Sequence, residues 1–268
     1  MAGPTVYPEL NAVLDELGSD VQAILGDNFC GAYLQGSFAV GEADEHSDVD
    51  FIVVTHGDVT DEELVALQAM HARIFRLASL WAQHLEGSYV PKDLLRRVDP
   101  EHTQLAFLDN GASELVLDDH CNTAVVRWVL REHGVALVGP DPASLVDPVS
   151  PAQLREEALR MIGTYVDWAQ EGAMNRWKQP YLVLTLCRIL HTLQAGVVGS
   201  KRESAEWALD ALAPEWTALI QLALDDRPDP SGRYYKPADR EVEARTLDFV
   251  DYASIYARVR SGARQGGS

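Results

Sequence analysis

The stretch from residue 31 to residue 54 constrains the fold of this chain most strongly. An apolar, strand-like run stops at Gly36 and Ser37, and after a polar loop a second apolar run begins with Asp48 and Asp50. Residues two apart in a strand project to the same face, so the two aspartates direct their carboxylates toward one point. Such carboxylates require a positive charge, and magnesium prefers oxygen ligands in the company of phosphates. Because glycine permits close backbone approach and Ser37 offers a hydroxyl and an N–H, the stretch predicts a phosphate cradle beside a divalent-metal site.

The charge balance narrows the class of partner. The chain has 268 residues, of which 22 are basic and 41 acidic, for a formal charge of −19. A nucleic-acid surface needs clustered lysine and arginine, so this balance argues against a nucleic-acid partner. It would steer a polycationic small substrate toward the protein, although an acidic surface also simply keeps a protein in solution.

The sequence gives no signal for export, membrane insertion or a metal-thiolate site. Its three cysteines are widely spaced and form no C-x-x-C pair, so neither a disulfide framework nor a zinc site follows. The N-terminus lacks the basic and apolar regions of a signal peptide, and the longest apolar run, residues 181–198, is interrupted by Arg188 and His191. We therefore expect a cytoplasmic protein without a membrane partner, and a monomer.

The first half of the chain mixes helical and strand patterns. Besides the two strands around the opening stretch, the predicted elements lie at residues 8–25, 60–81, 85–90, 124–132 and 134–140. The strand at 134–140 is expected to be short and buried. Residues 99–117 show no assignable pattern, and the run Asp118-Asp119-His120 is interpreted as a turn that leads into a helix.

The second half is helical throughout. A proline-rich segment at 141–148 precedes it, and helices are predicted at residues 150–171, 180–196, from 200, 214–225 and 240–260, with a loop at 227–237. We therefore predict an α/β (α+β) domain over residues 1–148 and an all-α helical bundle over residues 149–262. A disordered tail is expected over residues 263–268.

Two motifs carry a resemblance to known families. Gly36-Ser37, followed after ten residues by Asp48-x-Asp50, resembles the signature of the nucleotidyltransferase superfamily, whose members transfer a nucleotidyl group from a triphosphate with divalent metal held by such carboxylates. In the second half, three segments are similar to the helical domain of the aminoglycoside (3'')(9) adenylyltransferases, which inactivate streptomycin and spectinomycin. These segments are Val183 to Ile189, Ser200-Lys201 and Trp207-Ala208. The resemblance extends from about Gly31 to Leu212.

The resemblance implies a fold, two cofactors and a set of roles. It implies an N-terminal nucleotidyltransferase domain and a helical domain that closes the nucleotide and substrate cleft, with ATP as co-substrate and Mg²⁺ on Asp48 and Asp50. A third carboxylate is expected on a neighbouring strand, where Glu86 is the candidate. Glu86 would act as the general base on the acceptor hydroxyl and would share the metal. The alternative is an exposed glutamate at a strand edge.

Further residues are candidates for binding the triphosphate. Arg188 lies in an otherwise apolar helix, where a guanidinium needs an anion, either a phosphate or a buried carboxylate. Lys201 lies in the first turn of its helix, where a cation opposes the macrodipole unless a negative group is near. The resemblance implies that both reach the triphosphate, together with Gly36 and Ser37. It also implies nucleotide contacts for Ser47 and Asn122, although the family has an acidic residue at the latter position.

The acceptor is the least constrained part of the prediction. In the streptomycin-modifying relatives an aspartate and tryptophans recognise the drug, whereas this chain has Lys178 at the aspartate position and Gly111 near one tryptophan position. A lysine that faces a cationic aminoglycoside is unfavourable. Trp168 and Trp177 could substitute, or could pack in the core.

The sequence as a whole predicts a magnesium-dependent adenylyltransferase. It would transfer AMP from ATP to a hydroxyl of a small, cationic molecule such as spectinomycin or streptomycin, and so give antibiotic resistance. Three alternatives stay open: a nucleotide-binding regulatory protein without transfer activity, transfer to a different small-molecule hydroxyl, and a polynucleotide-directed transferase, which the negative charge disfavours.

Overall fold

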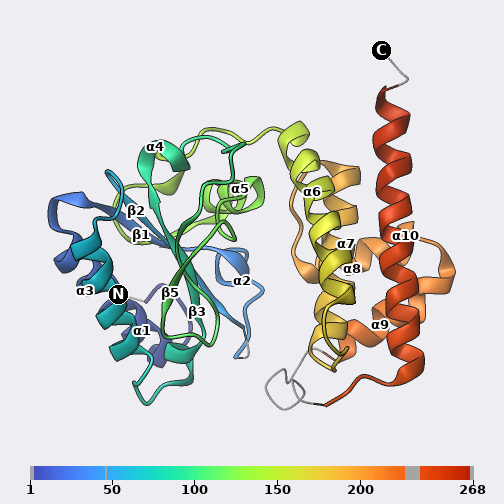
Figure 1. Ribbon diagram of the computed structural model, residues 1–268, viewed down its shortest axis with the longest axis horizontal. Helices are drawn as coiled ribbons and strands as arrows, with labels where there is room; N and C mark the ends of the chain where they lie inside the picture. The colour runs from blue at the N-terminus through green and yellow to red at the C-terminus, as the bar shows by residue number, and fades with distance from the viewer. Residues whose placement is uncertain (1–2, 46, 227–235, 266–268) are drawn as a thin grey trace. The chain divides into compact units, whose positions relative to one another are not determined.

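The computed structural model describes residues 3–45, 47–226 and 236–265. The chain divides into two compact units, Met1–Val149 and Ser150–Ser268, here called the N-terminal and the C-terminal unit. The N-terminal unit contains a sheet with helices, and the C-terminal unit is helical (Figure 1). This arrangement confirms the predicted fold class. In the described part of the chain, no helix is long and apolar enough to span a membrane.

A mixed six-stranded sheet forms the centre of the N-terminal unit, with the strand order β5-β4-β3-β2-β1-β6. The strands are β1 Phe29–Leu34, β2 Val49–Thr55, β3 Leu85–Pro91, β4 Leu105–Leu108, β5 Leu115–Asp118 and β6 Val135–Val138. Only β2 and β3 are parallel neighbours in this sheet, and every other adjacent pair is antiparallel. A parallel pair needs a crossover connection, which α3 supplies here.

Helices cover both faces of this sheet. They are α1 Pro8–Leu25, α2 Gly36–Ala39, α3 Asp61–Ile74, α4 Lys92–Leu95 and α5 Ala124–His133. Alternate residues of β2 enter two different cores, because successive strand side chains point to opposite faces. Phe51 and Val53 pack with α1 and α3 on one face, and Ile52 packs with α4 and α5 on the other. The strand between Asp50 and the following loop is therefore fixed from both sides.

The C-terminal unit is built around one helix. Its helices are α6 Pro151–Gln170, α7 Lys178–Ala195, α8 Lys201–Ala211, α9 Thr217–Asp225 and α10 Arg240–Gln265. α7 packs against all four of the others, and thirteen of its residues are buried. Because a helix that is apolar on most sides must be enclosed, this position follows from the sequence of α7.

The local start signals in the sequence are confirmed. Complete capping boxes begin three helices, at Thr60 for α3, at Ser150 for α6 and at Ser200 for α8. In each of them the N-cap hydroxyl accepts a backbone N–H three residues later, and the glutamate or glutamine at that position reaches back to the N-cap backbone. These boundaries were predictable because only four consecutive residues determine them.

Four expectations differ from the structure. The helix predicted over 60–81 ends at Ile74, and Trp81 lies in a separate 3₁₀ turn, Leu80–Gln83. The unassigned residues 99–117 contain β4 and most of β5, whose four-residue length is too short to show alternation. β6, expected to be buried, is a half-exposed edge strand. α10 extends to Gln265, into the segment expected to be a disordered tail. Residues 266–268 and most of the predicted loop, residues 227–235, lie outside the described residues.

Candidate active site

Three predicted carboxylates lie at the beginnings of the two parallel strands. In the register of β2 and β3, Asp50 is the direct partner of Glu86, so their side chains leave the sheet on the same face. Asp48 precedes β2 by one residue and is half-buried. The side chain of Glu86 is 16 % exposed, so it is not the exposed strand-edge glutamate of the alternative interpretation. The sheet therefore brings Asp50 and Glu86 together, as the sequence predicted.

Gly36 lies directly against the carboxylate of Asp50. Its φ angle is +61°, and a Cβ added to it would lie 1.9 Å from Asp50 Oδ2. The preceding residue, Gln35, donates its backbone N–H to the carbonyl oxygen of Asp50 at 2.9 Å. Any other residue at position 36 would therefore displace the carboxylate and strain the backbone. Ser37 follows in the same short turn, in α2.

Asn110 is a partner of the site that the sequence did not indicate. Its Nδ2 donates to Asp48 Oδ1 at 2.6 Å, and its Oδ1 lies 3.0 Å from His84 Nδ1. Asn110 follows β4, in the segment that was left unassigned. Asn110 lies close to Asp48 only because β4 pairs with β3. A local sequence pattern therefore could not have indicated this contact.

His120 is a second residue that sequence reasoning missed. Its Nε2 lies 3.1 Å from Glu86 Oε1. The hydrogen bond to Glu86 raises the pKa of His120, and the negative charges of Asp118 and Asp50 add to this increase. His120 lies in a turn before α5, as interpreted from the sequence, but the sequence did not indicate that its side chain contacts Glu86. The signal available in the sequence was a histidine next to two acidic residues, which alone is common.

Negative charge is concentrated around these carboxylates. Burial, and then the charge of Glu86, raise the pKa of Asp109. Burial raises the pKa of the Cys121 thiol, and the charges of Glu86 and Asp50 act in the same direction. Such an accumulation favours a bound cation.

The donor set fits magnesium that is shared with phosphates. Asp48, Asp50 and Glu86 offer only carboxylate oxygens, and the missing side chain of Gly36 leaves Asp50 Oδ2 room. In the described residues, no group of three His, Cys, Asp or Glu side chains is arranged to hold an ion by itself. Since magnesium commonly uses one or two carboxylates plus substrate phosphates, such a ready cage is not required.

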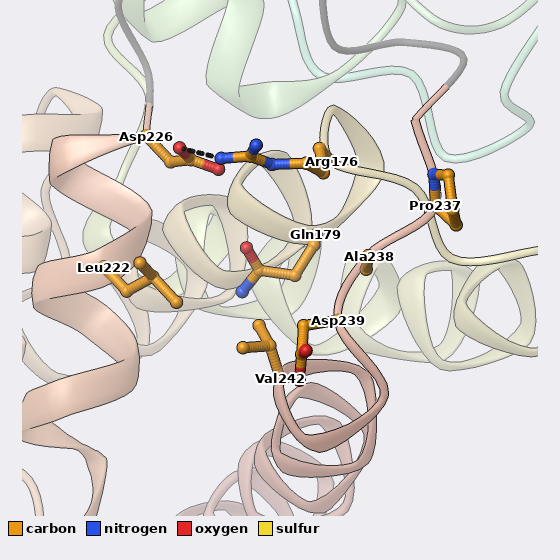
Figure 2. Close-up of a pocket in the computed structure, with 8 residues that line it drawn as sticks. All are labelled: Arg176, Gln179, Leu222, Asp226, Pro237, Ala238, Asp239 and Val242. Atoms are coloured by element: carbon orange, nitrogen blue, oxygen red, sulfur yellow. Dashed lines mark hydrogen bonds and ion pairs between the residues drawn. The ribbon is translucent and has the colours of Figure 1, made fainter.

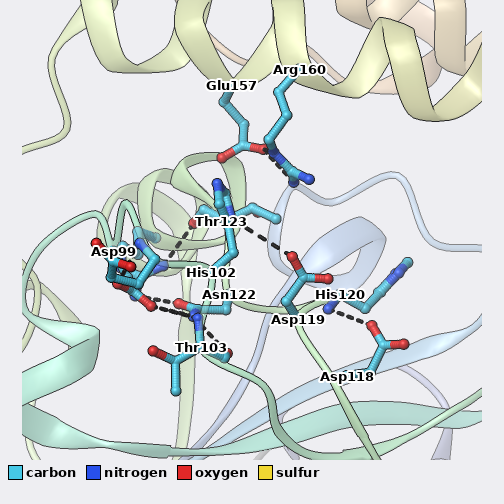
Figure 3. Close-up of polar contacts among 12 residues, drawn as sticks. Asp99, His102, Thr103, Asp118, Asp119, His120, Asn122, Thr123, Glu157 and Arg160 are labelled. Carbon is cyan, nitrogen blue, oxygen red and sulfur yellow. Dashed lines mark hydrogen bonds and ion pairs between the residues drawn. The ribbon is translucent and has the colours of Figure 1, made fainter.

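Asn122 lies in a buried network (Figure 3). Its Nδ2 donates to Asp99 Oδ2 at 2.8 Å and to the carbonyl of Thr103 at 2.9 Å, and its Oδ1 accepts from Arg127 Nη2 at 2.6 Å. Both halves of the amide are therefore engaged within the N-terminal unit. Ser47 is also buried, and its hydroxyl donates to Asp44 Oδ1 at 3.1 Å. A nucleotide contact by either residue stays a prediction.

The C-terminal unit carries the two predicted cationic contacts. Arg188 is half-buried on α7, and among the described residues no carboxylate pairs with its guanidinium, so the salt bridge considered from the sequence is not found there. Lys201 begins α8, and its Nζ lies 4.4 Å from the centroid of the Tyr181 ring. Tyr181 is itself stacked on Trp177, with ring centroids 5.0 Å apart.

Lys178 does not have the role that the sequence suggested. It is 5 % exposed, its Nζ donates to the carbonyl oxygens of Trp168 and Glu171, and burial lowers its pKa. These carbonyls belong to the C-terminal end of α6, where a cation is favourable. The unfavourable contact with a cationic acceptor that the sequence raised for Lys178 is therefore not presented by this buried ammonium. Trp168 packs against the core, the second of the two uses considered for it.

A cavity of about 380 Å³ lies within the C-terminal unit (Figure 2). Its wall is formed by Arg176, Gln179, Leu222, Asp226, Pro237, Ala238, Asp239 and Val242. An ion pair of 2.8 Å between Arg176 and Asp226 closes one side. None of the predicted site residues lines this cavity.

Both units match a protein-family model. Residues 30–97 match the nucleotidyltransferase domain, and residues 144–252 match the aminoglycoside adenylyltransferase C-terminal domain. The chain resembles the aminoglycoside (3'')(9) adenylyltransferases in both of its units. The resemblance predicted from the sequence is thereby confirmed.

Individual relatives support the same conclusion. An aminoglycoside (3'') (9) adenylyltransferase of Rhizobium radiobacter is 27 % identical over 229 residues, which cover 81 % of this chain and 82 % of the relative. A spectinomycin 9-adenylyltransferase of Staphylococcus aureus is 24 % identical over 216 residues, which cover 76 % of this chain and 79 % of the relative. The crystal structure of spectinomycin adenyltransferase AAD(9) from Enterococcus faecialis with ATP and spectinomycin shares the fold. Its TM-score is 0.72, at 15 % identity, with 92 % of this chain and 98 % of that chain covered.

Proposed function

We propose that this chain is a magnesium-dependent adenylyltransferase that moves AMP from ATP onto a hydroxyl of an aminocyclitol or aminoglycoside such as spectinomycin or streptomycin. Such a transfer would inactivate the antibiotic and give resistance. The register pairing of Asp50 with Glu86, with Gly36 against the first of them, carries the proposal. The names of the relatives, and the ATP and spectinomycin in the similar structure, support it.

Each carboxylate has a proposed part in the transfer. Asp48 and Asp50 would hold magnesium, which would neutralise phosphate charge. Glu86 would take the proton from the acceptor hydroxyl as its oxygen forms a bond to the α-phosphorus of ATP, while the bond to pyrophosphate breaks on the opposite side. Positioning and charge neutralisation would supply most of the acceleration.

The triphosphate contacts are proposed with unequal support. Gly36 and Ser37 lie beside Asp50, and Arg188 offers a half-buried guanidinium that no described carboxylate pairs. Lys201 offers an ammonium at a helix N-terminus, which a phosphate would complement. Asn122 would have to give up a hydrogen bond within its own network to reach a nucleotide, so it is the weakest candidate.

Pyrophosphate release across a panel of aminocyclitols and aminoglycosides tests the proposal. We expect release with ATP and Mg²⁺ in the presence of spectinomycin or streptomycin, its loss on chelation with EDTA, and its recovery on adding Mg²⁺. Binding of ATP with Mg²⁺ by calorimetry, without release against any acceptor, would instead identify a regulatory nucleotide-binding protein. Release with another hydroxyl compound alone would keep the transfer and change the acceptor.

A further inference from the structure

The side chain of His120 contacts one carboxylate oxygen of Glu86 at hydrogen-bonding distance. Nε2 of the imidazole and Oε1 of the carboxylate are 3.1 Å apart. An ionised carboxylate can only accept hydrogen bonds, so Nε2 must carry the proton. Among the described residues, Oε2 of Glu86 has no such partner, which leaves it as the oxygen able to accept a proton from a substrate.

His120 is itself held on both sides along the chain. Its backbone N–H donates to Asp118 Oδ1 at 2.8 Å, at the end of β5 (Figure 3). Its ring lies beside that of Phe107 on β4, with centroids 5.2 Å apart and planes inclined by 31°. Two residues later the amide of Asn122 is fixed by three hydrogen bonds. These contacts fix the position of the imidazole, although half of the His120 side chain is exposed.

We propose that His120 is a positioning residue: its Nε2–H holds Oε1 of Glu86 and so presents Oε2 to the acceptor hydroxyl. This inference rests on the proposed role of Glu86 as the base. A glutamate side chain loses rotational freedom when it is ordered, and a hydrogen bond made before the substrate arrives removes that entropic cost from the reaction step. Partners that orient a reacting carboxylate in this way typically affect activity by about 10- to 100-fold when they are removed.

Two substitutions at the same position separate this role from a structural one. We expect His120→Leu, which cannot donate, to lower kcat about 10- to 100-fold while the KM for ATP and the melting temperature stay close to those of the unmodified protein. His120→Gln keeps a side-chain N–H donor and should restore most of kcat. His56→Leu, an exposed histidine of the same unit, is the matched control. An unchanged kcat in His120→Leu, or an equal loss in His120→Gln, would overturn the proposal.

A spectroscopic measurement tests the contact without any turnover. In the ¹⁵N-histidine-labelled protein, the ring signals of His120 are assigned by their loss in His120→Gln. We expect Nε2 to be protonated. A ring protonated on Nδ1 alone could not donate to Glu86 and would overturn the proposal. If no acceptor yields pyrophosphate, the proposed function fails, while the tautomer still decides whether His120 holds Glu86.

Discussion

His120 and Asn122 are two residues apart in sequence but belong to two different clusters of polar side chains in the N-terminal unit. The two clusters differ in how their charges are satisfied. His120 belongs to the first group, with Asp50 and Glu86, where the imidazole contacts Glu86, the charge of Asp50 also acts on it, and half of the His120 side chain is exposed. Asn122 belongs to the second, with Asp99 and Arg127, where each polar side chain is buried and hydrogen-bonded. Satisfied buried groups stabilise a fold, whereas a concentration of negative charge at a partly exposed site is suited to binding a cation or moving a proton.

The pKa values express the same contrast. Burial opposes the ionisation of Asp99, but hydrogen bonds from the Thr103 backbone and the Asn122 amide outweigh it and lower the pKa to about 2. In the other group, burial and the charge of Glu86 raise the pKa of Asp109. The comparison predicts that substitutions in the first group change turnover and that substitutions in the second change stability.

Glu86→Gln should have the largest effect. Without a carboxylate to take the proton, we expect kcat to fall about 1,000-fold. ATP binding by calorimetry and the free energy of unfolding should change little, since Gln has the same shape. Glu114→Gln, on the exposed surface of the same unit, is the control. Unchanged turnover in Glu86→Gln would remove Glu86 as the base.

Arg127→Met should show the opposite pattern. The guanidinium donates to the carbonyls of Leu94 and Leu95 and to Asn122, and its loss leaves these buried acceptors without that partner. We expect the free energy of unfolding to fall by about 3 kcal/mol in denaturant titrations. Turnover per folded molecule should stay within a few-fold of the unmodified protein.

Arg97→Met is the control for this loss of stability. The Arg97 side chain is 81 % exposed, and its ion pair with Asp147 should contribute little to stability, because water screens both charges. Equal losses in the two variants would contradict the distinction between buried and exposed polar contacts.

Gly36→Ala tests the close approach to Asp50. The added Cβ would collide with the carboxylate, so we expect kcat to fall about 100-fold, the usual effect of a misplacement of about 1 Å. Gly41→Ala is the matched control, because Gly41 also has a positive φ, +76°, but open space around it. If both variants lose the same activity, backbone strain explains the effect and the contact with Asp50 does not.

His71 extends the comparison to pH. Its Nε2 lies 2.7 Å from the Tyr89 hydroxyl in the core, and burial lowers its pKa from 6.5 to about 4. The folded state therefore requires the neutral ring, and its stability is complete above pH 6.5 and decreases as the pH falls toward 4. We expect a loss of about 2 kcal/mol between pH 7.5 and pH 5. Most of this pH dependence should disappear in His71→Gln, and a persistent dependence would assign it to other groups.

Local patterns predicted some parts of the molecule well. The capping boxes at Thr60, Ser150 and Ser200 depend on four neighbouring residues, and the sequence contains all of that information. The β2 carboxylates were predictable for the same reason, since Asp48 and Asp50 are two residues apart. Their pairing with Glu86 needed the assumption that residues 85–90 form the adjacent strand, which the structure supports.

Long-range packing determined what the sequence did not show. Asn110 and His120 reach the carboxylates only because β4 and β5 extend the sheet beyond β3, and these short strands carry no periodic pattern. Lys178 was assigned to a substrate surface, but its flexible stem allows the ammonium to turn inward to the carbonyls of α6. Asn110 and His120 therefore depended on partners distant in sequence, whereas the partners of Lys178 lie ten and seven residues before it, across the turn between α6 and α7.

The enclosure of α7 has a consequence for how such a chain can change over evolutionary time. A helix that touches four neighbours tolerates few new side chains, because each change of volume disturbs several contacts at once. The turn 171–177 that precedes the helix is largely exposed, so substitutions there should disturb the fold less than substitutions within α7. The proposed phosphate contact of Arg188 would then be carried by a helix that can change little, while the turn that leads into it remains open to change.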